Sequence, residues 1–287
     1  MAFNPKAVFI SPSSIADFEK CPQLYYYRSV YRSPRGLRLQ LTSPALALGS
    51  AIHDVLDQFL KLSLEEKTKN ELNRIFDWAW QGIAGEKGGF TSSQEEKETK
   101  NRGLQILERF WQQPRFRKVE PVKLPSFPKV DLGEDLILTG KLDWVEKEGD
   151  TYHIIDFKTG KNEEREDSLQ LPIYATLVSK LFKTDKIRTS YWYLDKGEEI
   201  TSFPETDLEQ TFKDLQQKGE IIKMVRQTQS FRCQSGQETC WACRDIHAIA
   251  QGKGKLVHVD PVNRKQEIYV LFPEAAEAEP ATDQLPF

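Results

Sequence analysis

The sequence predicts an α/β protein in which helices flank a mixed central sheet. Residues 136–158 contain two apolar stretches of period two, joined by a turn at Gly149 and Asp150, which is the pattern of a β-hairpin. A helix is expected downstream at 168–182, followed by another strand at 187–194. A hairpin, a helix and a returning strand are typical of layered α/β domains, in which helices cover the faces of a sheet.

Two acidic residues, Asp143 and Asp156, interrupt the predicted hairpin where apolar residues would be expected. Lys158 follows Asp156 by two residues, so both side chains project from the same face of one strand. Two carboxylates and a lysine converging on a sheet can hold a hard divalent cation beside an activated water. A buried acid without a partner is strongly unfavourable, which predicts partners for these aspartates. The alternative is an edge hairpin whose charges face water, and this pattern alone does not separate the two.

Length and composition indicate a soluble globular protein. The 287 residues, 39% hydrophobic and 29% charged, suffice for one large or two modest domains. No apolar run approaches the ~18 residues of a membrane span, and the N-terminus lacks the basic and apolar regions of a secretory signal. We therefore expect a cytoplasmic protein without a membrane segment.

The net charge of −3 is unevenly distributed along the chain. Residues 266–287 contain five acids and no Lys or Arg, so removing them leaves a formal charge of +2 on residues 1–265. We expect residues 266–287 to form a mostly disordered acidic tail. A mildly positive body can bind a phosphate backbone locally, whatever the charge of the whole chain.

The N-terminal part predicts two helices. Helix-capping serines precede a short helix that Pro22 ends, with Cys21 at the stop. Residues 45–62 have an amphipathic helical pattern, in which Gly49 lies one turn before His53. The glycine is expected to leave the helix surface bare where something must approach the imidazole. A lone histidine on a helix is more often structural than a ligand.

Residues 65–112 are polar and helix-rich and are broken at 82–89, which predicts a helical insertion beside the sheet. Its aromatic residues are expected in the core rather than as base-stacking platforms; they are Trp78, Trp80, Phe110 and Trp111. In the helix after the hairpin, Gln170 and Tyr174 are four residues apart and share one face. A long helix is expected at about 207–226.

The four cysteines lie in two segments far apart in the sequence. Cys21 is near the start of the chain, and the other three form the pattern Cys233-x6-Cys240-x2-Cys243 near its end. In a cytoplasmic protein a C-x-x-C motif is more often metal-binding or redox-active than a disulfide. Four thiolates match the requirement of a [4Fe–4S] cluster or of a tetrahedral zinc site.

Four motifs together resemble the core of the PD-(D/E)XK nuclease superfamily, in particular its RecB-type branch. In the family's order they are Gly49-x-x-x-His53, Gly-Lys-Leu-Asp143, Ile-Ile-Asp156-Phe-Lys158-Thr-Gly and Gln170-x-x-x-Tyr174. The resemblance covers most of residues 10–245. It implies a restriction-endonuclease-like α/β fold for residues 1–265, with the helical insertion at about 65–112.

The resemblance also implies roles for individual residues. The implied ligands of Mg²⁺ or Mn²⁺ are His53, Asp143, Asp156 and the backbone carbonyl of Phe157. Such a metal polarises a phosphate and activates a water. Lys158 would orient that water and stabilise charge on the phosphate, while Gln170 and Tyr174 would contact the DNA strand.

For the cysteines, the resemblance points to the iron–sulfur subgroup, which includes AddB-type subunits and CRISPR-associated adaptation nucleases. A [4Fe–4S] cluster on Cys21, Cys233, Cys240 and Cys243 would join the N-terminus to segment 233–250. One departure stands out, because Cys233 precedes the C-x-x-C pair where the family usually has a cysteine after it. Ile249 stands near that later position, and His247 is a nearby alternative ligand. We favour the iron–sulfur cluster, with Zn²⁺ as the alternative.

These observations predict a Mg²⁺- or Mn²⁺-dependent deoxyribonuclease, acting as an exonuclease preferentially on single-stranded DNA. The expected setting is DNA repair, recombination or CRISPR adaptation. The alternative is a non-catalytic DNA-binding or scaffold subunit of a repair complex, although such a subunit has no need to keep His53, Asp143, Asp156 and Lys158 together. No Gly-rich loop with a Walker lysine is present, so the chain cannot be its own helicase motor.

The end of the chain, PEAAEAEPATDQLPF, combines acids with the apolar tip Gln284-Leu285-Pro286-Phe287. It resembles the acidic Pro-Phe tip of bacterial single-stranded-DNA-binding proteins and the Gln-Leu-aromatic motif that docks on the sliding clamp. The tail is therefore a candidate docking segment for a sliding clamp or another replication or repair protein. The alternative is a solvated tail without a partner.

Overall fold

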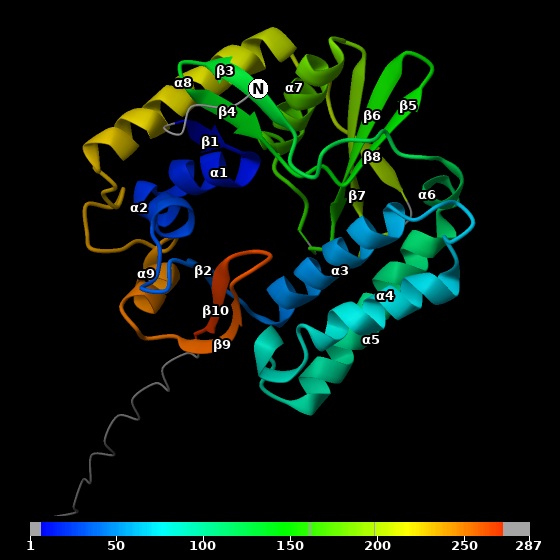
Figure 1. The fold of residues 1–287 in the computed structure, drawn as a ribbon, viewed down its shortest axis with the longest axis horizontal. Coiled ribbons are helices and arrows are strands. Elements are labelled where there is room, and N and C mark those ends of the chain that lie inside the picture. Colours follow the sequence, from blue (N-terminus) through cyan, green and yellow to red (C-terminus); the bar gives the residue numbers. More distant parts are fainter. Residues whose placement is uncertain (1–6, 161, 198, 272–287) are drawn as a thin grey trace, which may run out of the picture.

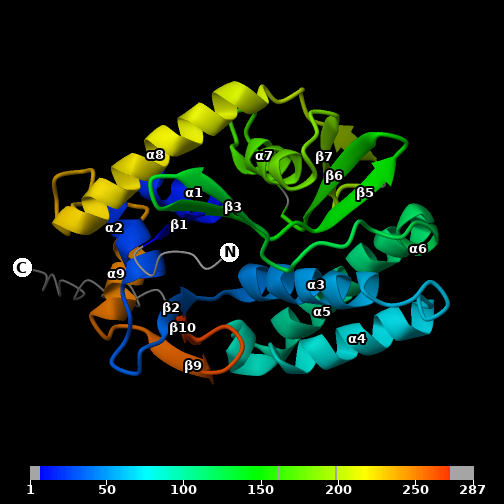
Figure 2. The same ribbon diagram turned by 45° about the horizontal axis from the view of Figure 1, so that its top comes forward.

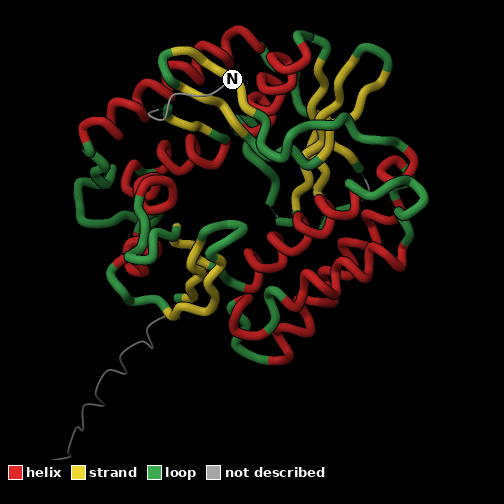
Figure 3. The backbone as a smooth tube through the Cα atoms, in the orientation of Figure 1, coloured by secondary structure: helices red, strands yellow, loops and turns green. Residues whose placement is uncertain are grey.

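The computed structural model describes residues 7–160, 162–197 and 199–271. Figure 3 shows three separate groups of strands, with helices between and around them. The largest is a four-stranded sheet of β5 (Trp144–Glu148), β6 (Thr151–Lys158), β7 (Ile187–Tyr193) and β8 (Ile200–Ser202). β5 and β6 form the expected antiparallel hairpin, β6 and β7 are parallel, and β7 and β8 are antiparallel. The predicted mixed α/β fold is confirmed.

Residues 136–145 do not form one strand, contrary to the prediction. β4 (Leu136–Thr139) belongs to a separate sheet, parallel to β1 (Val8–Ile10) and antiparallel to β3 (Lys129–Gly133). The chain leaves β4 at Gly140 and re-enters a strand only at Trp144, so Asp143 precedes β5 instead of lying inside a strand. The break frees the Asp143 side chain from the alternation of a regular strand.

Gly140 occupies a space too small for a side chain. A Cβ at this position would lie 2.9 Å from Tyr174 Cε1 and 3.1 Å from Leu177 Cδ1. Since Tyr174 is nearly fully buried, it cannot swing into solvent to make room. The bend between the two sheets therefore rests against α7 (Gln170–Phe182).

We expect Gly140→Ala to lower the free energy of unfolding by about 1–3 kcal/mol, as overpacked core substitutions do. Urea denaturation monitored by tryptophan fluorescence measures this loss. Gly160→Ala is the matched control, because a Cβ there meets no atom within 4 Å. Equal midpoints for the two variants would show that the close approach to Tyr174 does not constrain the bend.

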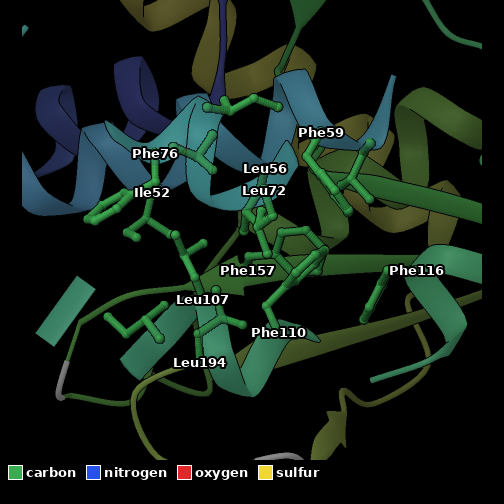
Figure 4. Packing of buried hydrophobic residues seen from close by; sticks show 14 of the residues in the cluster. Ile52, Leu56, Phe59, Leu72, Phe76, Leu107, Phe110, Phe116, Phe157 and Leu194 are labelled. Atoms are coloured by element: carbon green, nitrogen blue, oxygen red, sulfur yellow. The ribbon is translucent and has the colours of Figure 1, made fainter. Parts of the chain in front are cut away.

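One face of the four-stranded sheet is covered by the helical insertion and its neighbours. These helices are α3 (Pro44–Leu60), α4 (Lys69–Gln81), α5 (Ser93–Gln112) and α6 (Arg115–Lys118), with a short 3-10 turn at Gly85–Gly88. Figure 4 shows their side chains packed together with Phe157 of β6. Phe116 stacks on Trp192 of the sheet with ring centroids 5.0 Å apart.

Of the four insertion aromatics, two lie fully in this core, one lies partly in it and one lies outside it. Trp80 and Phe110 are buried as expected, and Trp111 is partly buried. Trp78 is 65% exposed, so its predicted place in the core is wrong. It lies two residues from Trp80 on α4, which turns it about 200° away from the buried face.

The opposite face of the sheet packs against α7 and, beyond it, α8 (Leu208–Thr228), as Figures 1 and 2 show. The same core includes α1 (Pro12–Lys20) and the β1–β4–β3 sheet. The four-stranded sheet is thus the middle layer of the domain. None of the helices in the described ranges is both long and apolar enough to cross a membrane.

The two ends of the described chain meet in a third sheet. β2 (Arg38–Leu41) pairs in parallel with β10 (Gln266–Val270), which pairs antiparallel with β9 (Lys255–Asp260). Around it lie α2 (Pro22–Tyr25), a π-helical turn at Tyr26–Val30 and α9 (Arg244–Ala250). We call this unit the terminal module, comprising residues 21–41 and 233–270.

β10 corrects the predicted tail boundary, because residues 266–270 are part of the fold. Glu267, which was counted as a tail acid, is 2% exposed and forms an ion pair with Arg35 at 2.9 Å. Moving it into the body lowers the body's formal charge from +2 to +1. The rest of the predicted tail, residues 272–287, lies outside the described residues.

Candidate active site

A cavity of about 340 Å³ opens where β6, α3 and α7 meet. It brings together all seven residues that the sequence analysis proposed as catalytic, metal-binding or DNA-binding. The residues lining it are His53, Lys141, Asp143, Asp156, Phe157, Lys158, Thr159, Gly160, Asn162, Glu164, Gln170 and Tyr174. Segments more than 100 residues apart in the sequence therefore contribute to one site.

The alternation of β6 aims its polar residues at this cavity. Ile155 and Phe157 point into the core formed with the helical insertion, whereas Ile154 lies in the core under α7. Asp156 and Lys158 continue the Ile154 side of the strand toward its end, where the apolar layer stops. A carboxylate and an ammonium group thus replace core side chains at the edge of a packed face.

His53 and Asp143 form the first half of the site. His53 Nδ1 lies 3.1 Å from Asp143 Oδ1, while Asp143 Oδ2 accepts a hydrogen bond from the Phe157 N–H at 2.9 Å. The second bond fixes Asp143 to β6 although it lies outside β5. Burial by itself would lower the pKa of His53, but the carboxylates of Asp143 and Asp156 outweigh it and raise that pKa.

Asp156 is 3% exposed and has one oxygen without a hydrogen bond. Its Oδ1 accepts from Gln170 Nε2 at 2.9 Å. Its Oδ2 accepts no hydrogen bond from the described residues, although Lys158 Nζ lies 3.1 Å away as an ion pair. Burial and the nearby Asp143 carboxylate raise the pKa of Asp156 well above that of a free carboxyl group.

Lys158 is held between two carboxylates and an amide oxygen. Its Nζ pairs with Asp156 at 3.1 Å and with Glu164 at 3.0 Å, and it donates to Gln170 Oε1. Although burial opposes the charge, these carboxylates raise the pKa of Lys158, so the side chain is a fixed cation. Gln170 also donates to the Tyr174 hydroxyl at 3.2 Å, which orients the amide between lysine and carboxylate.

The residues present fit a hard divalent cation. His53 Nδ1 and Asp143 Oδ1, which lie 3.1 Å apart, are both atoms that bind such cations. Asp156 Oδ2 supplies a further buried acceptor, which accepts no hydrogen bond from the described residues and is paired with Lys158 at 3.1 Å. These oxygen and imidazole donors are typical ligands of Mg²⁺ and Mn²⁺.

Five lining residues were not proposed from the sequence, and three of them, Lys141, Thr159 and Glu164, make contacts that shape the site. Lys141 lines the cavity and pairs with Asp57 at 3.3 Å, and Glu164 holds Lys158. Thr159 explains Gly49, because a Cβ at Gly49 would lie 3.1 Å from Thr159 Oγ1. The bare helix surface thus accommodates the chain after Lys158. Lys141 could have been predicted as a site residue from its position two residues before Asp143.

The helical insertion also supports this segment. Arg102 of α5 donates to the Thr159 carbonyl at 3.1 Å and pairs with Asp195 at 2.8 Å. Arg109 donates to the carbonyl oxygens of Leu194 and Asp195. The insertion therefore braces the loops after β6 and β7, at the end of the sheet where the site lies.

A second acid–histidine cluster lies in the face of the sheet opposite the site. Glu146 and His153 are buried and their side chains are 3.1 Å apart. Arg115 and Arg188 fill the cluster, because Arg115 pairs with Glu146 at 3.2 Å and Arg188 lies 3.0 Å from His153 Nδ1. Two guanidinium groups already neutralise its acids, so it is a structural network and not a cation site.

All four cysteines converge in the terminal module. Their Sγ atoms lie within 4.8 Å of one another, and Cys243 Sγ is 3.8 Å from the Sγ atoms of both Cys233 and Cys240. Cys21, Cys233 and Cys243 are buried. Hydrogen bonds with Ser235 lower the pKa of the Cys233 thiol, which favours the thiolate form that metals bind.

Cys233 therefore completes the set from the N-terminal side of the C-x-x-C pair. His247 is not a fourth ligand, because its Nδ1 lies 2.9 Å from the Tyr27 hydroxyl and its Nε2 faces Glu238. Tetrahedral zinc with Zn–S bonds of about 2.3 Å requires sulfur atoms about 3.8 Å apart. Two of the sulfur separations are 3.8 Å and all lie within 4.8 Å, which is close to this edge. A [4Fe–4S] cluster binds each thiolate to a different iron, which spreads the sulfurs farther apart.

A mixed α/β fold that gathers two aspartates, a lysine and a histidine at the end of its central hairpin is typical of metal-dependent nucleases. A sequence model of the PD-(D/E)XK nuclease superfamily matches residues 10–245. The chain belongs to this superfamily. No curated protein shows significant sequence similarity to it. A solved structure, "Crystal structure of SSO0001", is similar with 8% identity and a TM-score of 0.29, covering 73% of this chain and 82% of that one.

Proposed function

We propose that the protein is a Mg²⁺- or Mn²⁺-dependent deoxyribonuclease that hydrolyses phosphodiester bonds. The observation that carries this proposal is the convergence of His53, Asp143, Asp156 and Lys158 on one cavity. They come from a helix, a bend and a strand, and each contacts at least one of the others. Membership of a nuclease superfamily supports the same conclusion.

In this proposal the cation ligands are His53, Asp143, Asp156 and the carbonyl of Phe157. When bound, the cation supplies a Lewis acid for the phosphate and for the attacking water. Lys158 holds a permanent positive charge against the reacting phosphate, where it stabilises developing negative charge. Gln170 fixes the directions of Asp156 and Lys158, and Tyr174 supplies a buried hydroxyl beside them.

The alternative, a non-catalytic DNA-binding or scaffold subunit, does not require this arrangement. Asp156 and Lys158 form a largely buried ion pair at 3.1 Å, and burying two charges costs desolvation energy that an apolar pair would avoid. A site released from catalysis would gain stability from apolar or amide residues at these positions. The retained buried charges therefore support a working cation site.

We expect the purified protein to degrade end-labelled single-stranded DNA with Mg²⁺ or Mn²⁺ and to be inactive in excess EDTA, because its carboxylates need the cation to attract a phosphate. Gel analysis of labelled single-stranded and duplex substrates measures this, and shows whether products are released from an end. The expected pattern is stepwise shortening of the single strand. Persistent cleavage in EDTA, or intact DNA with both metals, contradicts the proposal.

For the cysteine site we propose a single structural zinc ion. The sulfur separations support zinc, whereas the resemblance to the iron–sulfur subgroup supports a [4Fe–4S] cluster. Either metal centre would join α1 and α2 to the segment that begins at Cys233. Its function in this proposal is structural, because the terminal module lies apart from the catalytic residues.

The pathway is proposed from the sequence resemblance. It places the nuclease in DNA repair, recombination or CRISPR adaptation. Docking of the apolar tip Leu285-Pro286-Phe287 on a sliding clamp or another replication or repair protein would bring the enzyme to such DNA.

A further inference from the structure

A second cavity adjoins the catalytic one. It has a volume of about 990 Å³ and lies between α1, β2, the segment before β3 and the loop that precedes α7. Four residues line both cavities, namely Lys141, Glu164, Gln170 and Tyr174. The two cavities are therefore adjacent. We call the larger one the trough; its cationic and aromatic lining residues are Lys20, Arg38, Phe127, Lys141, Arg165 and Tyr174.

The acids that line the trough are neutralised by ion pairs. Glu19 pairs with Lys218, Glu164 with Lys158 at 3.0 Å, and Asp167 with Arg165 at 2.8 Å. By contrast, Lys20 and Arg38 have no carboxylate at ion-pair distance within the described chain. Both are exposed, and Arg38 donates to the backbone carbonyl of Arg264 at 3.0 Å. The trough therefore presents two cations that are free to meet an anion.

Arg32 of the terminal module lies near two further cations, Arg38 of β2 and Arg226 of α8. Burial, together with these two guanidinium groups, lowers the pKa of Arg32. Arg32 and Arg226 donate to backbone carbonyls and to the Tyr25 hydroxyl, not to carboxylates. Clustered cations without acids are unfavourable in the free protein and are stabilised by phosphate.

Phe127 adds an aromatic surface to the lining of the trough. Its side chain is 60% exposed although it lines a cavity. Phe127, Lys20 and Arg38 line one cavity. An exposed ring together with unpaired cations is the combination by which proteins bind single-stranded nucleic acid, with a base on the ring and phosphates on the cations.

We propose that single-stranded DNA lies in the trough with a base stacked on Phe127 and phosphates on Lys20 and Arg38, and passes Lys141 into the catalytic cavity. This inference rests on the proposed nuclease function and names the substrate form that the site receives. Phe127, Lys20 and Arg38 lie outside the catalytic cavity, so they bind the strand away from the reacting phosphate.

Binding of a fluorescent oligothymidylate in EDTA tests the trough without cleavage. Phe127→Ala should weaken binding about tenfold to a hundredfold, the range of one base–aromatic stack. The double variant Lys20→Ala/Arg38→Ala should lower the slope of log affinity against log salt by about 1.4, since each phosphate contact to a single strand contributes about 0.7. Affinity for blunt duplex DNA should be lower than for the single strand in the parent protein.

Matched controls lie elsewhere on the surface. Trp78→Ala removes an aromatic side chain that is 65% exposed, and Lys213→Ala/Arg74→Ala removes one lysine and one arginine that are paired with acids. Both should bind the oligonucleotide as the parent does. Parent-like binding by Phe127→Ala, or equal losses in the controls, overturns the trough. The binding assay in EDTA does not depend on cleavage, so the two proposals can fail separately. If the trough variants bind more weakly but the parent protein cuts no DNA with Mg²⁺ or Mn²⁺, the trough stands and the nuclease proposal fails.

Discussion

Lys158→Ala is expected to lower the rate of DNA cleavage by at least about 10²–10³-fold, the loss typical of one transition-state charge contact. The substitution removes the cation that lies between Asp156 and Glu164. Metal binding should persist, because the two site aspartates then face less competing positive charge. Calorimetric titration with Mn²⁺ measures the binding, and initial rates on labelled single-stranded DNA measure the cleavage.

Asp143→Ala should lose both properties. Its two oxygens contact His53 Nδ1 and the Phe157 N–H, so the substitution removes one ligand and releases the neighbours that it positions. Lys196→Ala is the matched control for lysine removal, because that side chain is 41% exposed and pairs with Glu163 away from the cavity. Full activity of Lys158→Ala, or undiminished Mn²⁺ binding by Asp143→Ala, would contradict the assigned roles.

The resemblance to the nuclease superfamily pointed to these residues, and local rules explain why their pairs share a face. Asp156 and Lys158 are two apart on a strand, and Gln170 and Tyr174 are four apart on a helix, so each pair shares a face whatever the rest of the fold does. The structure then places both pairs at one cavity, where Gln170 contacts Asp156 and Lys158. The β5–β6 hairpin was predictable for the same reason, since its turn contains Gly149 at φ 60°.

Other features depend on tertiary contacts that no local pattern encodes. The break at Gly140 follows from the proximity of Tyr174, more than thirty residues downstream. Glu164 lies in a charged loop, and its sequence neighbours do not show that it reaches Lys158. β10 was assigned to the tail because its strand pairs with β2 at the other end of the chain, so its partner was out of range of any local pattern.

The parallel β2–β10 pairing and the Arg35–Glu267 ion pair connect the two parts of the terminal module without a metal. A metal on the four cysteines, as proposed above, would add a second connection, between Cys21 and the segment from Cys233 to Cys243. Three of the four cysteines lie buried in the small apolar cluster of this module, so we expect its stability to depend on what the thiolates bind.

Cys243→Ser is expected to lose the bound metal and to lower the melting temperature by at least about 10 °C. Structural zinc contributes about 10–16 kcal/mol of apparent binding free energy in small domains, and that energy is folding energy. Unfolding should be local at first, because the four-stranded sheet has cores of its own. Hydrogen exchange should therefore rise in β2, β9 and β10 while β6 and β7 stay protected.

Metal analysis of anaerobically purified protein identifies the ion. A single zinc requires colourless protein with about one zinc per chain, whereas a [4Fe–4S] cluster gives brown protein with broad absorbance near ~400 nm. Ser235→Ala is the control, because it removes a hydrogen bond to Cys233 Sγ but keeps all four thiolates, and its metal content should equal the parent's. Stoichiometric iron would identify the bound metal as an iron–sulfur cluster instead of zinc, and the proposed structural function would be unaffected. A parent protein without metal, together with equal melting temperatures for the parent and Cys243→Ser, would contradict both metals, since the four sulfur atoms would then be held together by packing alone.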